Sequence, residues 1–250
     1  MELYNKDCYE VMKERIWDNS VNCIITDPPY GVGFKNNFYD DSEETVLENM
    51  PKWFEQWYRV LKPNGFLYLF VGVKTIHKWI QCGIDAGFTF KNIIATRSFN
   101  NGAMTPPNNF GFQFQPILVF SKGKGRMFNR VDFIPTSEEW LVDSRNTNPK
   151  PYTYQYPNWI ETEWAFATAK NTQKNNHPNE KNTTLIKFLI EISTDKGDKV
   201  LDCFMGCGTT GLACVYSNRD FIGCEIDKNY FNVAVGRIDY SMRNMEIEII

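Results

Sequence analysis

The chain has 250 residues, of which 42% are hydrophobic and 23% charged, and a net charge of −3. These values are ordinary for a globular protein and allow one substantial α/β core. They exclude a protein that coats polyanions generally, so a nucleic-acid enzyme of this composition must concentrate its positive charge locally. No run approaches the ~18 apolar residues that a membrane span needs, and no signal segment is visible, so we expect a cytoplasmic protein without a membrane partner.

The seven cysteines, at positions 8, 23, 82, 203, 207, 214 and 224, form no Cys-x-x-Cys pair. Four of them fall between 203 and 224, which raises a metal hypothesis. Their spacings do not match zinc templates, and several lie among apolar neighbours on predicted strands. We therefore expect buried free thiols and no metal.

The chain opens with a short strand within 2–8, followed by a helix with Val11, Met12 and Ile16 on its apolar side. Asp7 stands at the end of this strand. Its carboxylate can cap the helix, and it can also accept hydrogen bonds from a ligand amine or ribose. The residue pattern leaves both roles open.

A buried strand over 21–26 is followed at once by Asp27-Pro28-Pro29-Tyr30. Each proline fixes its own φ and pushes the preceding residue out of the helical region, so this turn is extended and stiff. Open α/β sheets bind ligands at such strand ends. A carboxylate (Asp27), a free carbonyl (Pro28) and an aromatic face (Tyr30) can together grip a planar ring that carries an amino group. The alternative is a turn with no such role.

This stretch resembles the target-amine motif of the DNA amino-methyltransferases, which reads Asp/Asn/Ser-Pro-Pro-Tyr/Phe/Trp. The resemblance implies a methyltransferase that uses S-adenosylmethionine, with Asp27, Pro28, Pro29 and Tyr30 as catalytic residues. It also implies that the acidic residue at position 7 lies beside the adenine of the cofactor.

Helices and strands alternate through the next part of the chain, which predicts a mostly parallel, doubly wound sheet. The expected elements are a mobile loop over 31–41, a helix over 46–61 that Lys62-Pro63-Asn64-Gly65 ends, a strand over 65–71, a helix over 74–86, a strand over 88–96, a loop over 100–109 and a strand over 112–120.

Composition shifts at Ser121. Residues 121–176 hold eight Lys or Arg against six Asp or Glu, and aromatic residues interleave with polar residues and prolines. The segment is either an irregular insertion with its own small core or a DNA-facing element in which cations meet phosphates. The methyltransferase resemblance favours the second interpretation. The candidate DNA-binding residues are Lys122, Lys124, Arg126 and Arg130.

A second turn of interest lies near the end of the chain. Residues 177–181 precede a helix over 183–194, whose first backbone amides can bind a carboxylate. A strand over 198–204 then leads into the glycine-rich turn 205–211 and a helix, and the next strand ends at Glu225. Glycines let a ligand approach the backbone, and Glu225 can accept both hydroxyls of a ribose. The alternative is an ordinary tight strand–helix turn.

Asp202-x-Phe204-x-Gly206-x-Gly208 resembles the Phe-x-Gly-x-Gly motif that binds S-adenosylmethionine in methyltransferases. The cofactor-binding residues that we expect are Asp7, Cys8, Asp27, Lys181, Asp202, Phe204, Gly206, Cys207, Gly208, Thr209, Thr210, Glu225 and Ile226. The target-amine motif comes first and the cofactor motif last, which is the beta-class arrangement of DNA amino-methyltransferases. Cys203 and Cys207 depart from the Pro and Ser of many relatives, and Asn182 stands where Pro is usual.

The resemblance implies a Rossmann-like methyltransferase fold. It places a catalytic domain at 1–120 and 177–250 and a target-recognition insertion at 121–176. For this fold to work, the two motifs must form adjacent pockets, one for a sulfonium and one for an amino-bearing ring.

The implied function is methyl transfer to the N6 amine of a flipped-out adenine in double-stranded DNA, because an Asp-led motif goes mostly with N6-adenine in this family. Alternatives are an N4-cytosine target, a methyltransferase acting on RNA, protein glutamine or a small amine, a catalytically silent DNA- or cofactor-binding subunit, and a nicotinamide oxidoreductase. The resemblance leaves open a homodimer and a cognate restriction endonuclease on a separate chain.

Overall fold

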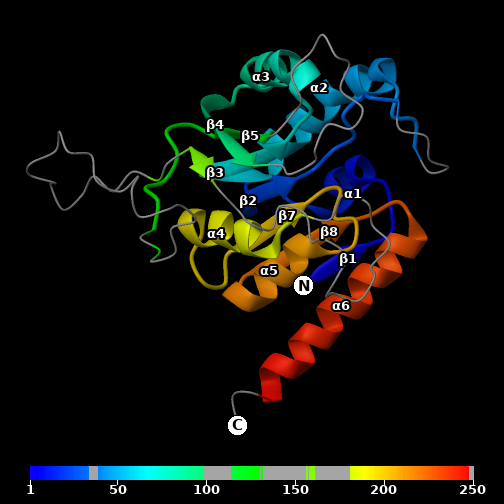
Figure 1. Ribbon diagram of the computed structural model, residues 1–250, viewed down its shortest axis with the longest axis vertical. Coiled ribbons are helices and arrows are strands. Elements are labelled where there is room, and N and C mark those ends of the chain that lie inside the picture. The colour runs from blue at the N-terminus through cyan, green and yellow to red at the C-terminus, as the bar shows by residue number, and fades with distance from the viewer. Residues whose placement is uncertain are drawn as a thin grey trace, which may run out of the picture.

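In the part of the chain that the structure describes, an eight-stranded sheet lies between two layers of helices (Figure 1). The structure, a computed structural model, describes residues 1–33, 39–97, 114–129, 131, 156, 158–160 and 181–247. The strands are β1 (Glu2–Tyr4), β2 (Val21–Thr26), β3 (Leu61–Phe70), β4 (Thr89–Arg97), β5 (Phe114–Ser121), β6 (Trp159–Ile160), β7 (Lys199–Asp202) and β8 (Asp220–Cys224). The helices are α1 (Cys8–Arg15), α2 (Glu43–Val60), α3 (Ile76–Asp85), α4 (Thr183–Ser193), α5 (Thr209–Ser217) and α6 (Lys228–Ile247), with a short 3-10 helix, η1, at Val73–Thr75.

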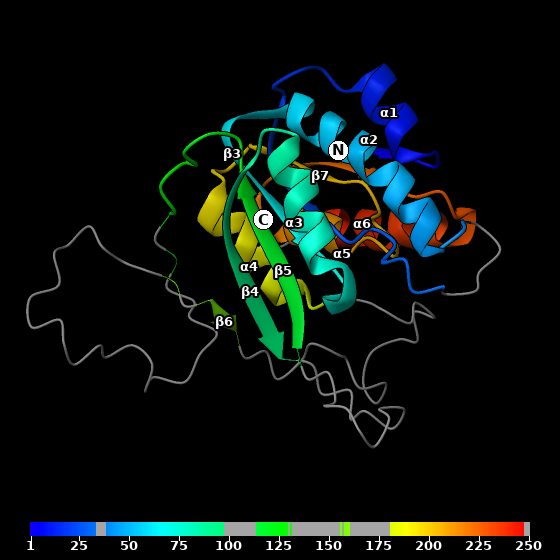
Figure 2. The same ribbon diagram turned by 90° about the horizontal axis from the view of Figure 1, so that it is seen from above.

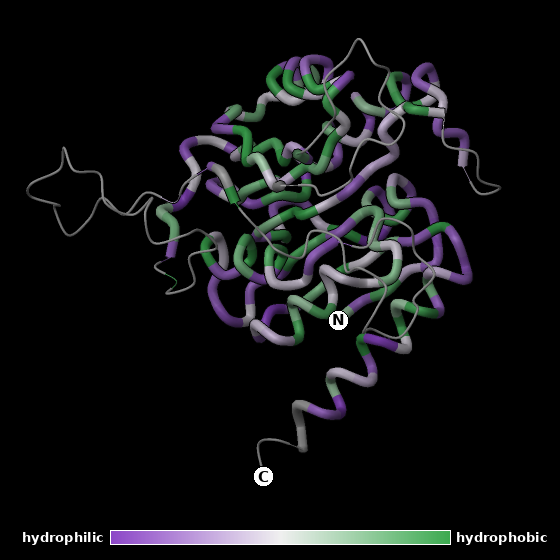
Figure 3. The backbone as a smooth tube through the Cα atoms, viewed as in Figure 1, coloured by the Kyte–Doolittle hydropathy of each residue, from purple (hydrophilic) through white to green (hydrophobic). Residues whose placement is uncertain are grey.

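Alternation along the strands explains the two layers. In β2, Ile24 is buried among residues of α1 and α2, whereas its neighbour Ile25 is buried among residues of α4 and α5. Successive side chains of a strand point to opposite faces, so each face of the sheet needs its own helices. Helices α1, α2 and α3 cover one face and α4, α5 and α6 cover the other (Figures 1 and 2). Figure 3 shows hydrophobic residues concentrated along the strands between these layers.

The strand order is β1-β8-β7-β2-β3-β5-β4-β6, and its first five strands are mutually parallel. From β7 the chain passes through α5 to β8 on one side, and from β2 it passes through α2 to β3 on the other. The crossovers therefore diverge between β7 and β2. Such a topological switch point opens a crevice at the carboxyl ends of the strands, which is where α/β sheets bind ligands.

The predicted, mostly parallel sheet is confirmed, and strand β5, which runs antiparallel to both β3 and β4, makes it a mixed sheet. One predicted strand boundary differs. Strand β3 begins at Leu61, directly after α2, and not at Gly65. Leu61 is fully buried opposite Val21, and the next pair is Cys23 with Phe66, so the polar residues between them form a bulge. Asn64, with φ of 65°, supplies the left-handed conformation that this bulge needs.

The described parts of the predicted insertion 121–176 pack onto the sheet domain. Ser121 completes β5, and β6 adds to the sheet beside β4. The Tyr156 ring lies edge-on to Phe188 of α4, with ring centroids 5.1 Å apart. Most of this segment lies outside the described residues, so its role as a target-recognition unit stays a prediction.

All seven cysteines are free, and all except Cys82 are buried, as predicted for structural thiols. Among the described residues, no group of three or more His, Cys, Asp or Glu side chains is arranged to hold a metal ion. No helix in the described part of the chain combines the length and apolarity needed to cross a bilayer.

Candidate functional site

The turn after β2 holds Asp27 between two donors. The Tyr30 hydroxyl donates to Asp27 Oδ1, and the Lys181 ammonium lies 2.9 Å from Asp27 Oδ2. Burial raises the pKa of the Tyr30 phenol well above its usual value, and the Asp27 carboxylate adds to this shift. Tyr30 therefore stays neutral and acts as a hydrogen-bond donor. The two prolines before it set the extended path that brings its side chain back to Asp27.

Gln115, a residue that no sequence motif points to, completes this cluster from the start of strand β5. Its Nε2 donates to the Tyr30 hydroxyl, and its Oε1 lies 3.2 Å from Lys181 Nζ. Because β5 is antiparallel, its amino-terminal end lies at the same edge of the sheet as the carboxyl end of β3. Only the reversed direction of β5 brings Gln115 to the site, and nothing in its local sequence announces this.

The cofactor-type turn after β7 is held by Asp202. Its Oδ1 accepts from Thr26 Oγ1 at 3.0 Å and from the Phe204 amide at 3.1 Å, and its Oδ2 accepts from Thr210 Oγ1 at 2.6 Å. Burial raises the pKa of Asp202 to about 7. This carboxyl ties β7 to β2 and to the start of α5. It was predicted as a cofactor ligand, and that role stays a prediction; within the protein both of its oxygens have partners.

Two glycines make the turn possible. Gly206 has φ of 52° and Gly208 has φ of 84°, a region that favours glycine. A Cβ atom added to Gly208 would lie 2.9 Å from the Cβ of Ala234 in α6. Gly208 is therefore the left-handed N-cap of α5 and packs against α6, and it does not line the cavity described below.

Glu225, at the end of β8, lies across from this turn. Its Oε2 accepts from the Gly206 amide at 2.9 Å, and its Oε1 accepts from the Asp227 amide at 2.8 Å. Burial raises its pKa, and the two backbone hydrogen bonds oppose that shift. Asn5, a further residue that the sequence analysis did not assign, donates to the carbonyls of Glu225 and Ile226 at 2.8 and 3.1 Å. Asn5 thereby fixes the strand end that carries the acid.

Asp7 caps α1, with Oδ1 accepting from the Tyr9 and Glu10 amides at 2.9 and 3.3 Å. The capping role that the sequence left open is therefore observed, and Asp7 also lines the cavity beside Glu225. The start of α4 was expected to bind a carboxylate. Instead, Asn182 Oδ1 accepts from the Thr184 and Leu185 amides at 2.8 and 3.1 Å, so this helix start is capped by its own chain.

A cavity of about 350 Å³ brings these segments together. It is lined by residues from both motifs and from the chain start, among them Asp7, Cys8, Asp27, Pro28, Pro29, Tyr30, Phe204, Gly206, Glu225 and Ile226. A smaller space of about 40 Å³ adjoins the same motifs. It is lined by the remaining candidates apart from Gly208, namely Lys181, Asp202, Cys207, Thr209 and Thr210, together with Asp27, Phe204 and Gly206. The two motifs therefore lie side by side at one cavity, and their roles as a sulfonium pocket and an amine pocket stay predictions.

The charge in the larger cavity is one-sided. Among the described residues that line it, six are acidic (Asp7, Asp27, Asp40, Asp41, Glu225 and Asp227) and one, Lys6, is basic. One wall is apolar, where the Trp53 ring lies edge-on to Phe204 with centroids 5.2 Å apart. Such a cavity suits a ligand with a planar ring and positive charge. Trp53 was predicted as core, and it serves both the core and this wall.

The predicted DNA contacts Lys122 and Arg126 lie at the opposite edge of the sheet. Lys122 Nζ donates to Asn19 Oδ1 and to the carbonyls of Tyr58 and Leu61 at 2.7 to 2.9 Å. Arg126 pairs with Asp195 at 3.0 Å. These cations are bound to the protein itself, next to the amino-terminal ends of β2, β3 and β7, and their assignment as DNA ligands stays a prediction.

Two other predicted DNA contacts stay untested. Lys124 is exposed at the same amino-terminal edge of the sheet, and Arg130 lies outside the described residues. The 31–41 loop is also described only in part, since residues 34–38 lie outside the described ranges, while Tyr39 lines the cavity.

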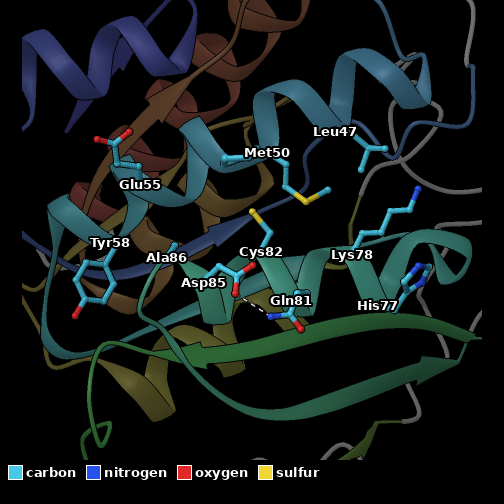
Figure 4. A pocket seen from close by; sticks show the side chains of 11 residues that line it. Leu47, Met50, Glu55, Tyr58, His77, Lys78, Gln81, Cys82, Asp85 and Ala86 are labelled. Carbon is cyan, nitrogen blue, oxygen red and sulfur yellow. Dashed lines mark hydrogen bonds between the residues drawn. The ribbon is translucent and has the colours of Figure 1, made fainter.

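A larger groove of about 720 Å³ lies between α2 and α3, as Figure 4 shows. Leu47, Met50 and Cys82 form its apolar part, and Lys78 at its rim is paired with Glu43. None of the motif residues lines this groove. Size alone therefore does not mark the reactive site in this molecule.

The mostly parallel sheet, with the glycine-rich turn after β7 beside the Asp27–Tyr30 turn after β2, has the fold of the Rossmann-like methyltransferases. The model of the DNA methylase family that groups N6 and N4 methyltransferases matches residues 21–236. This chain belongs to that family and is a DNA amino-methyltransferase.

Individual relatives agree with this assignment. The type II methyltransferase M.HpaI of Haemophilus parainfluenzae is 32% identical over 232 residues, which cover 89% of this chain and 69% of the relative. The DNA adenine methyltransferase YhdJ of Escherichia coli strain K12 is 30% identical over 236 residues, which cover 90% of this chain and 79% of that relative.

Solved structures show the same fold. The crystal structure of the M1.HpyAVI–SAM complex has a TM-score of 0.64 and 27% identity, covering 94% of this chain and 98% of that one. The cytosine-N4-specific PvuII DNA methyltransferase has a TM-score of 0.68 and covers 96% of this chain and 90% of its own. It is 17% identical in sequence, so this similarity concerns the fold alone.

Proposed function

We propose that this DNA amino-methyltransferase transfers a methyl group from S-adenosylmethionine to the N6 amine of adenine in double-stranded DNA. One observation carries the proposal: Asp27 lines both the 350 Å³ cavity and the smaller space beside the glycine turn. A group bound to Asp27 is thereby adjacent to a ligand held by Gly206 and Glu225. Positioning of this kind accounts for a large share of the rate in a transfer between two bound molecules.

The residues present fit the cofactor. A cavity of about 350 Å³ lies within the range that small-molecule ligands occupy. Its acidic lining suits a molecule with a sulfonium and an ammonium group. Glu225 would hold the ribose, and the apolar side chains of Phe204 and Ile226 would flank the adenine ring. When bound, S-adenosylmethionine would supply an electrophilic methyl group, and cleavage of its S–CH3 bond would leave the electron pair on sulfur and release S-adenosylhomocysteine.

Asp27 and the Pro28 carbonyl would each accept one hydrogen of the target amine. The lone pair of an exocyclic amine is delocalised into its ring, so the amine is a poor nucleophile. Two acceptors steer the nitrogen towards a tetrahedral geometry and free the lone pair for attack. The nitrogen gains a positive charge as it is methylated, and the Asp27 carboxylate would stabilise that charge and hold the proton until it passes to water.

The base must leave the duplex to reach Asp27, which costs a few kcal/mol of unstacking. Tyr30 would provide a replacement stacking surface. Its hydroxyl is held by Asp27 and Gln115, so the orientation of the ring is fixed before the base arrives.

Adenine is supported by two observations. The target-amine motif begins with Asp27, which in similar enzymes goes mostly with N6-adenine, and the 30% identical relative from Escherichia coli is named a DNA adenine methyltransferase. The second candidate is N4-cytosine, which the PvuII structure makes worth testing. Both bases present an amine next to a ring nitrogen, so Asp27 itself does not choose between them. A homodimer and a separate restriction endonuclease stay predictions.

The test is methylation of long double-stranded DNA with labelled S-adenosylmethionine, followed by digestion to nucleosides. We expect N6-methyladenine at defined sites. Detection of N4-methylcytosine instead would mean that the target base is cytosine and would leave the proposed class of reaction unchanged. Absence of transfer to either base, with the cofactor bound, would contradict the proposal and favour a catalytically silent subunit.

A further inference from the structure

Lys181 was expected to contact the cofactor, but the structure places its ammonium on the acceptor side of the site. Its Nζ lies 2.9 Å from Asp27 Oδ2, 3.2 Å from Gln115 Oε1 and 3.4 Å from the Tyr30 hydroxyl. An ammonium has three N–H groups, and these three acceptors match them in number. The Lys181 side chain is 17% exposed and that of Asp27 is 25% exposed, so water screens this pair less than it screens a surface pair.

Two aromatic rings confine the ammonium further. Lys181 Nζ lies 5.1 Å from the centroid of Phe70, the last residue of β3, and 5.9 Å from that of Tyr30. Cations are attracted to such ring faces within about 6 Å. Ionic, hydrogen-bonding and ring contacts from three strands' ends therefore hold Lys181 in one place.

These contacts determine the orientation of the Asp27 carboxylate. Tyr30 occupies Oδ1 and Lys181 occupies Oδ2, so rotation of the carboxylate would break one bond or the other. An ionised carboxylate has about four lone-pair sites, and two remain for a target amine. The lysine thus fixes the acceptor without consuming it.

We propose that Lys181 is a positioning residue, which aims the Asp27 carboxylate at the target amine and does not bind the cofactor. The inference rests on the proposed function of Asp27 as the amine acceptor. An ammonium repels the positive charge that develops on the methylated nitrogen. Lys181 therefore helps the reaction by orienting the Asp27 carboxylate and not by stabilising this charge. A neutral side chain that still donates to Asp27 should therefore keep part of the activity, whereas one that cannot donate should lose it.

The experiment compares Lys181→Met, which has no donor, with Lys181→Gln, which keeps a neutral one. Lys187→Met is the matched control, since Lys187 lies on α4 and pairs with Glu191 at 3.4 Å. We expect kcat on DNA to fall by about 100-fold in Lys181→Met, the cost of a misplaced reacting group. Lys181→Gln should fall between that variant and the wild type, and Lys187→Met should match the wild type.

Calorimetry separates this role from cofactor binding. The probes are S-adenosylhomocysteine and 5′-methylthioadenosine, which lacks the amino-acid carboxylate. We expect Lys181→Met to bind both with unchanged affinity. Weakened binding of S-adenosylhomocysteine alone would show a contact with the cofactor carboxylate and overturn the proposal. A kcat in Lys181→Met equal to that of the wild type would also overturn it.

A second variant guards against a general structural effect. In Lys181→Ala, added propylammonium can occupy the space of the missing side chain and donate to Asp27. Restoration of kcat by propylammonium supports the positioning role, and a failure to restore any activity in this folded variant contradicts it.

If the wild type itself transfers no methyl group to DNA, the proposed function fails and this inference falls with it. If the wild type is active and every Lys181 variant is as well, only this inference fails.

Discussion

The two edges of the sheet both carry charged side chains, but they hold them differently. At the amino-terminal edge, Lys122 is bound by two backbone carbonyls and an asparagine, and Arg126 is bound by Asp195. At the carboxyl-terminal edge, acidic residues outnumber basic ones six to one in the lining of the cavity. The first edge neutralises its charges internally, whereas the second keeps an excess of negative charge even though Lys181 pairs with Asp27.

The difference in charge balance indicates which edge of the sheet is suited to bind a ligand. Charges that are matched within the chain serve to join elements, as Lys122 joins the end of α2 to the start of β3. An unmatched excess is costly to assemble and is expected where a ligand of opposite charge compensates it. The local balance of charge, and not its density in the sequence, distinguishes the reactive edge.

The largest expected effect is at Asp27. We expect Asp27→Ala to lower kcat by on the order of 1000-fold, because the target amine loses its charged acceptor. The affinity of this variant for S-adenosylmethionine should equal that of the wild type. Asp18→Ala is the matched control at the other edge, where Asp18 pairs with Arg59. Near-normal turnover of Asp27→Ala in a radiolabelled transfer assay would remove Asp27 from the chemistry.

A smaller effect is expected at Glu225. Replacing it with alanine removes the ribose acceptor and the two backbone hydrogen bonds that it accepts from Gly206 and Asp227. We expect the dissociation constant for S-adenosylhomocysteine to rise by about 10- to 100-fold in a calorimetric titration. Glu225→Gln keeps one acceptor oxygen and should fall in between. An unchanged affinity in Glu225→Ala would exclude Glu225 from the cofactor site.

The amino-terminal edge should respond in stability and not in activity. Lys122→Met leaves three acceptors without their donor, so we expect a loss of about 1 to 3 kcal/mol in the free energy of unfolding by urea. The turnover of folded protein and its affinity for DNA should not change. Lys124→Met, an exposed neighbour, is the control and should be neutral in stability. A marked loss of DNA affinity in Lys122→Met would instead support the predicted role of Lys122 as a DNA contact.

Asp202 gives the subtlest test, through pH. Its pKa in the folded protein is raised to about 7 by burial, whereas an unfolded aspartate titrates near 3.9. The folded protein therefore binds the extra proton, and its contribution is fully present below about pH 4 and lost as pH rises through about 7. Unfolding by urea should show the wild type losing a few kcal/mol over this range relative to Asp202→Asn. Parallel pH profiles for the two proteins would contradict the buried, protonated state.

The two turns whose shape depends on their own prolines and glycines could be predicted from the sequence. The Asp27–Tyr30 turn and the Gly206–Gly208 turn were found because prolines and glycines dictate conformation within a few residues. Gln115 and the pairing of Lys181 with Asp27 were not foreseen, because these contacts depend on which distant strand ends meet. The same limit applies to the pairing of Arg126 with Asp195 and to the acceptors of Lys122, which lie far away in the sequence.

The most direct test of the account is a crystal structure of this protein with S-adenosylmethionine. We predict that the ribose lies on Glu225 and that the methyl group faces the Asp27 carboxylate, leaving room for an amine about 3 to 3.5 Å from the methyl carbon. A cofactor bound in the groove between α2 and α3, or one with its methyl group turned away from Asp27, would contradict the central claim that both motifs serve one transfer.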